Sequence, residues 1–101
     1  MWNGIDEGTT IGTIGSESGE IIVDVEHELG ARLTIEKGGC TAPFSITSGV
    51  YGCFVHTSFY SSIDEAKSDL ETMKSEISEF FGSENTKEKD YEWINRFVDK
   101  H

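Results

Sequence analysis

The sequence predicts an α+β fold, in which an antiparallel sheet of four to five N-terminal strands is covered by one long amphipathic helix and followed by a short aromatic helix. Hydrophobic residues alternate with a period of two between residues 20 and 60, and repeat with a period of about 3.6 from residue 62 onward. Strands that precede the helices as a block favour this arrangement over a parallel βαβ layout. A length of 101 residues is a common size for one domain, so residues 1–101 are expected to form a single domain.

Residues 1–19 form a leader that is rich in Gly, Ser and Thr. Turns are predicted there, with a short edge strand around Thr9–Ile14. The spaced glycines of the leader do not form a phosphate-binding P-loop, because no Gly-Lys-Ser/Thr follows them and the leader contains no lysine. A bound nucleotide is therefore not expected.

Residues 20–60 are expected to form the antiparallel strands. A first hairpin joins a strand that begins at Glu20 to a strand that begins at Ala31, with one face toward water. The opposite face is predicted to be buried and consists of Ile21, Val23, Val25, Ala31, Leu33 and Ile35. Two further strands are predicted over Phe44–Ser48 and Cys53–Tyr60. The last strand is apolar or aromatic on both faces, which predicts that it lies in the middle of the sheet or faces a partner.

Two helices are expected after the strands, over residues 62–82 and 86–100. Ser62 and Glu65 form a capping box that marks the start of the first helix, and Gly82 marks its end. Its core-facing stripe consists of Ile63, Ala66, Leu70, Met73, Ile77, Phe80 and Phe81. The second helix carries the large apolar residues Tyr91, Trp93, Ile94, Phe97 and Val98. Either it packs on the first helix and the sheet edge, or it docks on a partner or another subunit.

The chain is strongly acidic, with 19 Asp and Glu against 8 Lys and Arg and a net charge of −11. The first 31 residues contain no lysine or arginine. Such a surface repels phosphate, so neither nucleic acid nor an anionic membrane is expected as a partner. The charge either keeps the protein soluble or attracts a protein with a basic surface. The sequence shows no secretory signal and no apolar run of the roughly 18 residues that a spanning helix needs, so a cytoplasmic location is expected.

No residue pattern typical of an enzyme or a metal site is present. Cys53 and His56 cannot form a catalytic pair within a strand, because side chains three residues apart point to opposite faces. The spacing of Cys40 and Cys53 matches no common zinc pattern, and two cysteines in a chain without an export signal are expected to be reduced thiols, although they could pair. We expect no metal and no cofactor. The absence of motifs argues against catalysis, although scattered residues can still build an active site.

Two functional hypotheses follow. The first is a non-enzymatic interaction protein, such as an inhibitor, an immunity-type protein or an accessory subunit, which binds a basic partner or a second copy of itself. Its expected contacts are the acidic residues Asp24, Glu26 and Glu28 and the aromatic residues Tyr91, Trp93 and Phe97.

The second hypothesis is a small-ligand or enzymatic domain. Its pocket would lie between sheet and helix and would be lined by His27, Tyr51 and His56. His27 falls on the apolar face near the end of its strand, where it is either a proton shuttle or a boundary residue hydrogen-bonded to a carbonyl.

Overall fold

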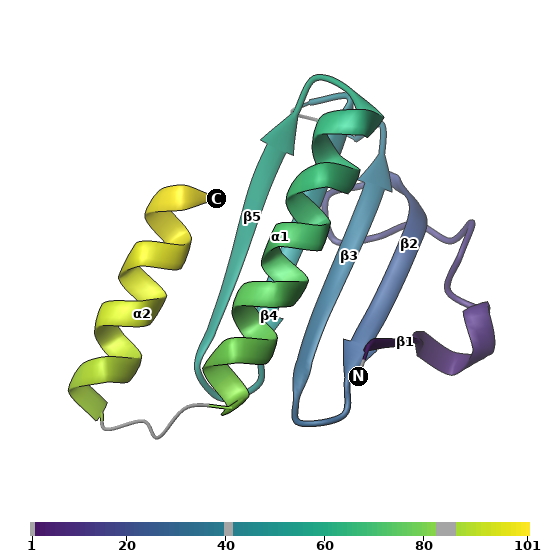
Figure 1. Ribbon diagram of the computed structural model, residues 1–101. Coiled ribbons are helices and arrows are strands. Elements are labelled where there is room, and N and C mark those ends of the chain that lie inside the picture. Colours follow the sequence, from purple (N-terminus) through teal and green to yellow (C-terminus); the bar gives the residue numbers. More distant parts are fainter. Residues whose placement is uncertain (1, 40–41, 83–86) are drawn as a thin grey trace.

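The computed structural model describes residues 2–39, 42–82 and 87–101, and it confirms the α+β class (Figure 1). The elements are β1 (Trp2–Gly4), a 3-10 helix (Ile5–Gly8), β2 (Glu20–His27), β3 (Ala31–Lys37), β4 (Phe44–Val50), β5 (Phe54–Tyr60), α1 (Ile63–Gly82) and α2 (Lys87–Lys100). The predicted start of the second helix at residue 86 lies outside the described residues. Among the described residues, no helix combines the length and the apolar character that crossing a membrane requires.

The sheet is a meander in which each strand pairs with its neighbour in the sequence, in the order β1-β2-β3-β4-β5. All four pairings are antiparallel. Both helices lie on one side of the sheet: α1 packs across β3, β4 and β5, and α2 runs alongside it beyond β5 (Figure 1). Neither α1 nor α2 lies on the opposite side of the sheet, which is called the helix-free face below. β5 is an edge strand, so the predicted position of this segment in the middle of the sheet is wrong.

The core forms between α1 and the strands below it. The Ser62 hydroxyl accepts the N–H of Glu65 at 3.2 Å, as the capping box predicts, and α1 buries one stripe of side chains. The buried residues of α1 are Ala66, Leu70, Met73, Ile77 and Phe80. Leu33, Ile35 and Ile46 meet them from the sheet and are 0% exposed. Full burial of each such aliphatic side chain contributes about 1.5–3 kcal/mol.

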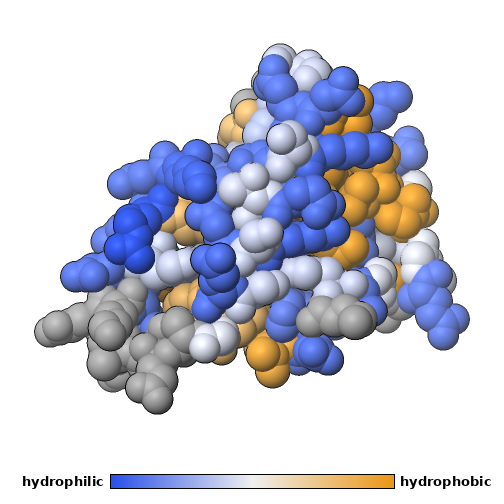
Figure 2. Space-filling view, in the orientation of Figure 1, coloured by the Kyte–Doolittle hydropathy of each residue, from blue (hydrophilic) through white to orange (hydrophobic). Residues whose placement is uncertain are grey.

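Aromatic rings join α2 to the sheet and to α1. The ring centroid of Trp93 lies 4.4 Å from that of Phe80, 5.1 Å from that of Phe97 and 5.9 Å from that of Phe54. The outward surfaces of α1 and α2 are mostly hydrophilic (Figure 2). α2 therefore packs on α1 and the edge of the sheet, the first of the two arrangements expected from its sequence.

A β-bulge in β2 changes the predicted face of one residue. The alternation placed Ile21 on the same face as Val23, but the register shifts between them, so Ile21 pairs with Glu36 while Val23 pairs with Ile35. Ile21 consequently lies on the helix-free face of the sheet, where it lines a groove. The predicted edge strand at Thr9–Ile14 is reduced to an isolated bridge between Ile14 and Glu20, and the edge strand is β1 instead.

Candidate interaction surface

The helix-free face of the sheet carries an open groove of about 870 Å³. Ile14 of the leader stands on one side of the groove. Tyr51 and Val55, at the turn end of the β4–β5 hairpin, stand on the other side. Thr34 and Thr47 lie between them on the sheet.

The groove exists because β4 has small side chains on this face. Thr47 and Gly49 alternate there, and neither rises above the sheet. A Cβ atom at Gly49 would lie 3.3 Å from the carbonyl oxygen of Phe54, so even a methyl group there would crowd the hairpin. Ile14 and Val55, by contrast, project from the surface and are 72% and 79% exposed. The walls are therefore apolar and the base is small and polar.

A buried carboxylate holds the leader against the sheet. Glu36 is 1% exposed, and its Oε1 accepts the backbone N–H groups of Glu17 and Gly19, each at 3.1 Å. A carboxylate can be buried when N–H donors of this kind replace its water. Gly15 passes so close to the same carboxylate that a Cβ atom there would collide with it. Glu36 thus sets the position of one wall of the groove.

An ion pair lies beside the groove on the same face. Arg32 donates two hydrogen bonds to Asp24, from Nε to Oδ1 at 2.9 Å and from an Nη to Oδ2 at 2.6 Å, and Thr34 donates a third to Oδ1 at 2.9 Å. Burial alone would raise the pKa of Asp24, but these donors outweigh it and hold the pKa below its usual value. Asp24 and Arg32 therefore neutralise each other.

Glu26 is the acidic group at the Tyr51 end of the groove. The Tyr51 hydroxyl donates to Glu26 Oε2 at 2.6 Å, and both residues are exposed. Partial burial and this hydrogen bond together raise the pKa of Tyr51, so the phenol stays neutral. Within the part of the chain that the structure describes, Glu26 forms no ion pair. Glu26 lies opposite Arg32 in the β2–β3 pairing and interacts with it electrostatically, but the hydrogen bonds of Arg32 go to Asp24. Asp24, Glu26 and Arg32 together therefore carry more negative than positive charge.

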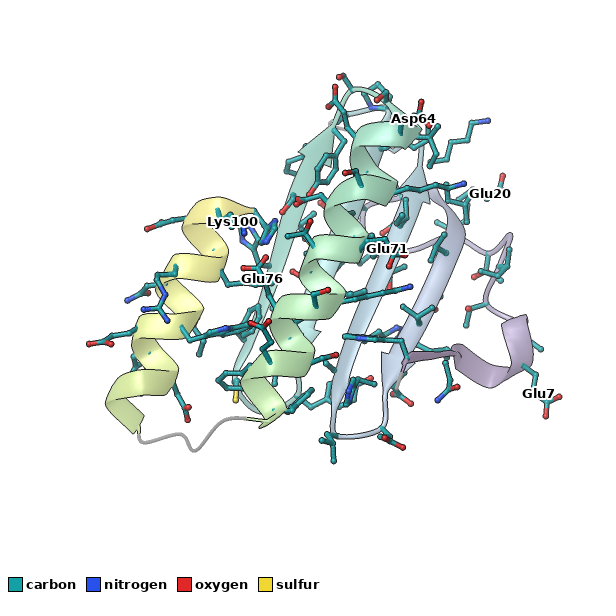
Figure 3. The ribbon with its side chains drawn as sticks, in the orientation of Figure 1. Glu7, Glu20, Asp64, Glu71, Glu76 and Lys100 are labelled. Carbon is teal, nitrogen blue, oxygen red and sulfur yellow. The ribbon has the colours of Figure 1, made fainter. Side chains whose placement is uncertain are left out.

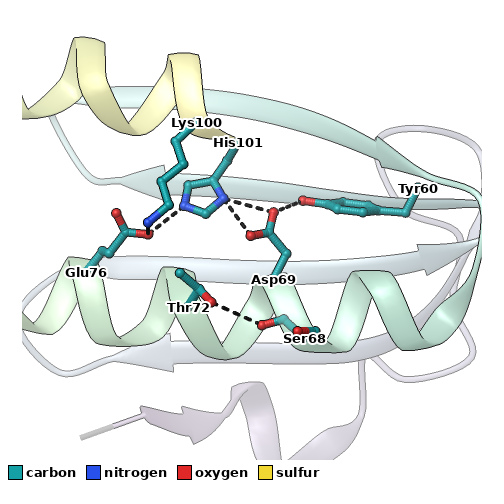
Figure 4. A network of polar contacts seen from close by, with 7 residues as sticks. All are labelled: Tyr60, Ser68, Asp69, Thr72, Glu76, Lys100 and His101. Carbon is teal, nitrogen blue, oxygen red and sulfur yellow. Dashed lines mark hydrogen bonds and ion pairs between the residues drawn. The ribbon is translucent and has the colours of Figure 1, made fainter.

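A second polar network joins α1, α2 and β5 on the helix-covered side (Figure 4). The His101 ring lies between two carboxylates of α1, with Nδ1 2.7 Å from Asp69 Oδ1 and Nε2 2.6 Å from Glu76 Oε1. Lys100 contacts the same Glu76 oxygen at 3.4 Å, and Tyr60 donates its hydroxyl proton to Asp69. Burial, reinforced by Asp69, raises the pKa of Tyr60. Because both His101 nitrogens are engaged and its side chain is 0% exposed, the ring joins the helices and cannot reach a substrate.

The acidic residues expected to contact a partner have different surroundings. Asp24 is 4% exposed and is occupied by Arg32 and Thr34, so it does not face outward. Glu26 and Glu28 are exposed near the β2–β3 turn. Acidic side chains are also spread over the molecule, from Glu7 near the N-terminus to Asp64 and Glu71 on α1 (Figure 3).

The three aromatic residues expected to anchor a partner also differ. Tyr91 is 69% exposed on α2. Phe97 is 1% exposed and belongs to the core, and Trp93 is partly buried against it. Of the three, Tyr91 alone projects from the surface.

The structure does not bring together the residues of the expected pocket. His27 and His56 lie on the helix-covered face of the sheet, whereas Tyr51 lies in the β4–β5 turn beside the groove. The His27 ring packs between Trp2 and Phe81, with centroids 5.2 Å and 4.8 Å away, and its Nδ1 accepts the N–H of Leu29 at 3.1 Å. Burial lowers the pKa of His27, which makes it a neutral boundary residue.

The Nε2 atom of His56 is buried without a hydrogen-bond partner among the described residues. Cys53 is a free, exposed thiol at the groove, and Cys40 lies outside the described residues. In the described part of the chain, no three His, Cys, Asp or Glu side chains are grouped so that they could hold a metal ion.

Several important residues were not identified from the sequence. The alternation of the first hairpin places Glu36 on the face toward water, and no local sequence pattern indicates that the leader covers it. Val55 and Phe59 are 79% and 47% exposed on β5. The sequence indicated this exposure only through the apolar character of both faces of the strand, which predicted either a central strand or contact with a partner. Because β5 is an edge strand, only contact with a partner stays a prediction.

The fold and this surface define a small α+β domain with an open, partly apolar groove on the uncovered side of its sheet. Comparison with known proteins found no matching family model, no similar curated protein and no similar solved structure.

Proposed function

We propose that the chain is a non-enzymatic protein–protein interaction domain, such as an inhibitor, an immunity-type protein or an accessory subunit, whose partner presents a basic surface. One observation carries the proposal: large apolar side chains project around an open groove on an acidic chain. Ile14, Tyr51 and Val55 are each more than half exposed there. Exposed apolar groups that gather around a groove on one face of a protein are typical of interaction sites and ligand-binding grooves.

The polar groups of the chain support binding rather than catalysis. Two of the three histidines are held in place by structural contacts, His27 between two aromatic rings and His101 between two carboxylates. Self-association is the weaker form of the proposal, because two chains of net charge −11 repel each other. A reducing, cytoplasmic location is part of the proposal and agrees with the exposed thiol of Cys53.

The test starts from affinity capture on the immobilised protein from the native cell extract, followed by the association rate of the captured protein. Raising the salt from about 0.01 M to about 1 M shortens the Debye length from about 30 Å to about 3 Å. We expect the association rate to fall by at least about tenfold over this range. Neutralising Glu26 and Glu28 together should reduce the rate at low salt, whereas the control Glu71→Gln on α1 should not. A rate that ignores both salt and these substitutions contradicts a basic partner.

A second candidate function is small-ligand binding, which the volume of the groove favours. About 870 Å³ lies within the range of ligand sites. However, such sites bury most of the ligand, and here both walls are largely exposed. A thermal-shift screen of small molecules distinguishes the two functions, because a ligand that binds only the folded state raises the melting temperature with concentration.

A further inference from the structure

We propose that the groove on the helix-free face binds an extended segment of another protein, in which aliphatic side chains accompany at least one lysine or arginine. This inference rests on the proposed interaction function and names the site and the chemistry of its occupant. It is carried by the shape of the groove, by the distribution of apolar groups on its walls, and by the excess of negative charge at one end.

The shape favours an extended chain over a compact ligand. Because Thr47 and Gly49 leave the surface of β4 low, the groove has a base but no roof. Ile14 on one wall and Val55 on the other are exposed over 72% and 79% of their surfaces. A chain that lies between them covers both walls at once and can leave the groove at either end. Aliphatic side chains of that chain would remove the two exposed residues from water.

The charge at the groove selects a cation. Arg32 is the only basic residue of β2, β3, β4 or β5 on this face, and Asp24 already binds it through two hydrogen bonds. Glu26 lies opposite Arg32 in the β2–β3 pairing, but its hydrogen bond comes from the neutral phenol of Tyr51, so Asp24, Glu26 and Arg32 together are negative. A lysine or arginine beside Tyr51 would therefore meet a carboxylate that forms no ion pair among the described residues, and an aromatic ring, both of which attract cations. A second copy of this chain fits poorly, because it brings a net charge of −11 to an acidic site.

The experiment uses a phage-displayed library of random dodecapeptides, panned on the full chain. We expect enrichment of peptides that combine aliphatic residues with Lys or Arg. The most enriched peptide is then synthesised and its affinity measured for the wild type and for variants. Ile14→Asp and Val55→Asp change exposed positions without touching the core, and each should weaken binding by at least about tenfold, which corresponds to about 1.4 kcal/mol. Glu26→Gln should weaken it about three- to tenfold and reduce its salt dependence.

The control is the same kind of substitution, an exposed aliphatic residue to Asp, at a position outside the groove. Leu29→Asp changes an aliphatic residue that is 64% exposed on the β2–β3 turn, and it should leave the affinity within about twofold. Enriched peptides without a basic residue, or an affinity that Ile14→Asp and Val55→Asp do not change, would overturn the inference. The absence of any enriched peptide would do the same. A captured protein partner that binds the wild type and Val55→Asp equally would also overturn it, yet would leave the interaction function standing.

Discussion

The two faces of the sheet differ in what covers them. On the helix-covered face, residues such as Leu33 and Ile35 are 0% exposed and α1 packs on them. On the helix-free face, the neighbouring positions carry Arg32, Thr34 and Glu36, and the leader covers only part of them. Because successive side chains of a strand alternate between faces, the same strands supply both surfaces. The comparison shows that residue parity along the same strands decides whether a side chain enters the core under α1 or lies on the face that carries the groove.

The largest expected difference concerns the apolar residues of the two faces. Leu33→Ala on the helix-covered face should lower the free energy of unfolding by about 2–5 kcal/mol, because it leaves a cavity in a closely packed core. Val55→Ala on the helix-free face should change it by less than about 0.5 kcal/mol, because the side chain is 79% exposed. Urea denaturation of both variants measures the difference. Equal losses would mean that Val55 is buried in solution and that the faces are not distinct.

The next effect tests the attachment of the leader to the helix-free face. Glu36→Ala removes the acceptor of the Glu17 and Gly19 N–H groups and should cost about 1–3 kcal/mol. Glu36→Gln keeps one acceptor oxygen and should cost less. Hydrogen exchange measured by NMR gives the local readout, since these two amides should lose protection in Glu36→Ala. Unchanged protection there would show that Glu36 does not hold the leader.

A matched pair of tyrosines gives a smaller difference. Tyr60→Phe on the helix-covered face removes a partly buried hydrogen bond to Asp69, and such bonds to charged groups contribute about 1.5 kcal/mol or more. Tyr51→Phe removes an exposed hydrogen bond to Glu26 and should cost less than about 0.5 kcal/mol. Thermal and urea unfolding of the two variants provide the measurement. The reverse order would contradict the assignment of Tyr51 to an exposed surface.

The smallest expected effects are two losses of stability at low pH, one from each face of the sheet and each in a different pH range. The pKa of His27 is lowered from 6.5 by burial, so as pH falls below 6.5 the unfolded chain binds a proton first and stability decreases until the folded state also titrates. The pKa of Asp24 is lowered from 3.8 by its donors, so the corresponding loss begins near pH 3.8 and ends below the folded pKa. His27→Gln should abolish only the first loss and Asp24→Asn only the second. Urea midpoints measured across this pH range report both. A wild-type curve that is flat between pH 7 and pH 5 would contradict the burial of His27.

The sequence was sufficient to predict β2 to β5, the two α-helices and most of the buried face, because these depend on local periodicity, but it did not predict β1. It failed where structure depends on a partner far along the chain. Alternation cannot reveal the bulge that turns Ile21 to the other face. The apolar character of both faces of β5 did not show that α2 covers Phe54 and leaves Val55 exposed.

The candidate site was harder to predict for the same reason. The groove forms only when residues 10–16 fold back over the sheet and lie across from the β4–β5 turn, and no local pattern encodes that path. His27 and Tyr51 were grouped by chemical type, but the first faces the helices and the second faces away from them. Glu26 could be identified as an outward acid from alternation alone, whereas its bond to Tyr51 depends on the way the turn after β4 folds back.

The contact between Glu36 and the leader has a consequence for how this chain can diversify. The N–H groups of Glu17 and Gly19 donate to Glu36 and secure the leader there. Between the 3-10 helix and this anchor, the leader bonds to β2 at few points, through the Ile14–Glu20 bridge and from the Gly12 N–H to the Ile21 carbonyl oxygen. Such a segment accepts substitutions and changes of length more readily than a strand does. Residues in the wall that carries Ile14 can therefore be substituted while the sheet that supports this wall stays the same. Under the proposed interaction function, substitutions in residues 9–14 would change the groove while leaving the sheet unchanged.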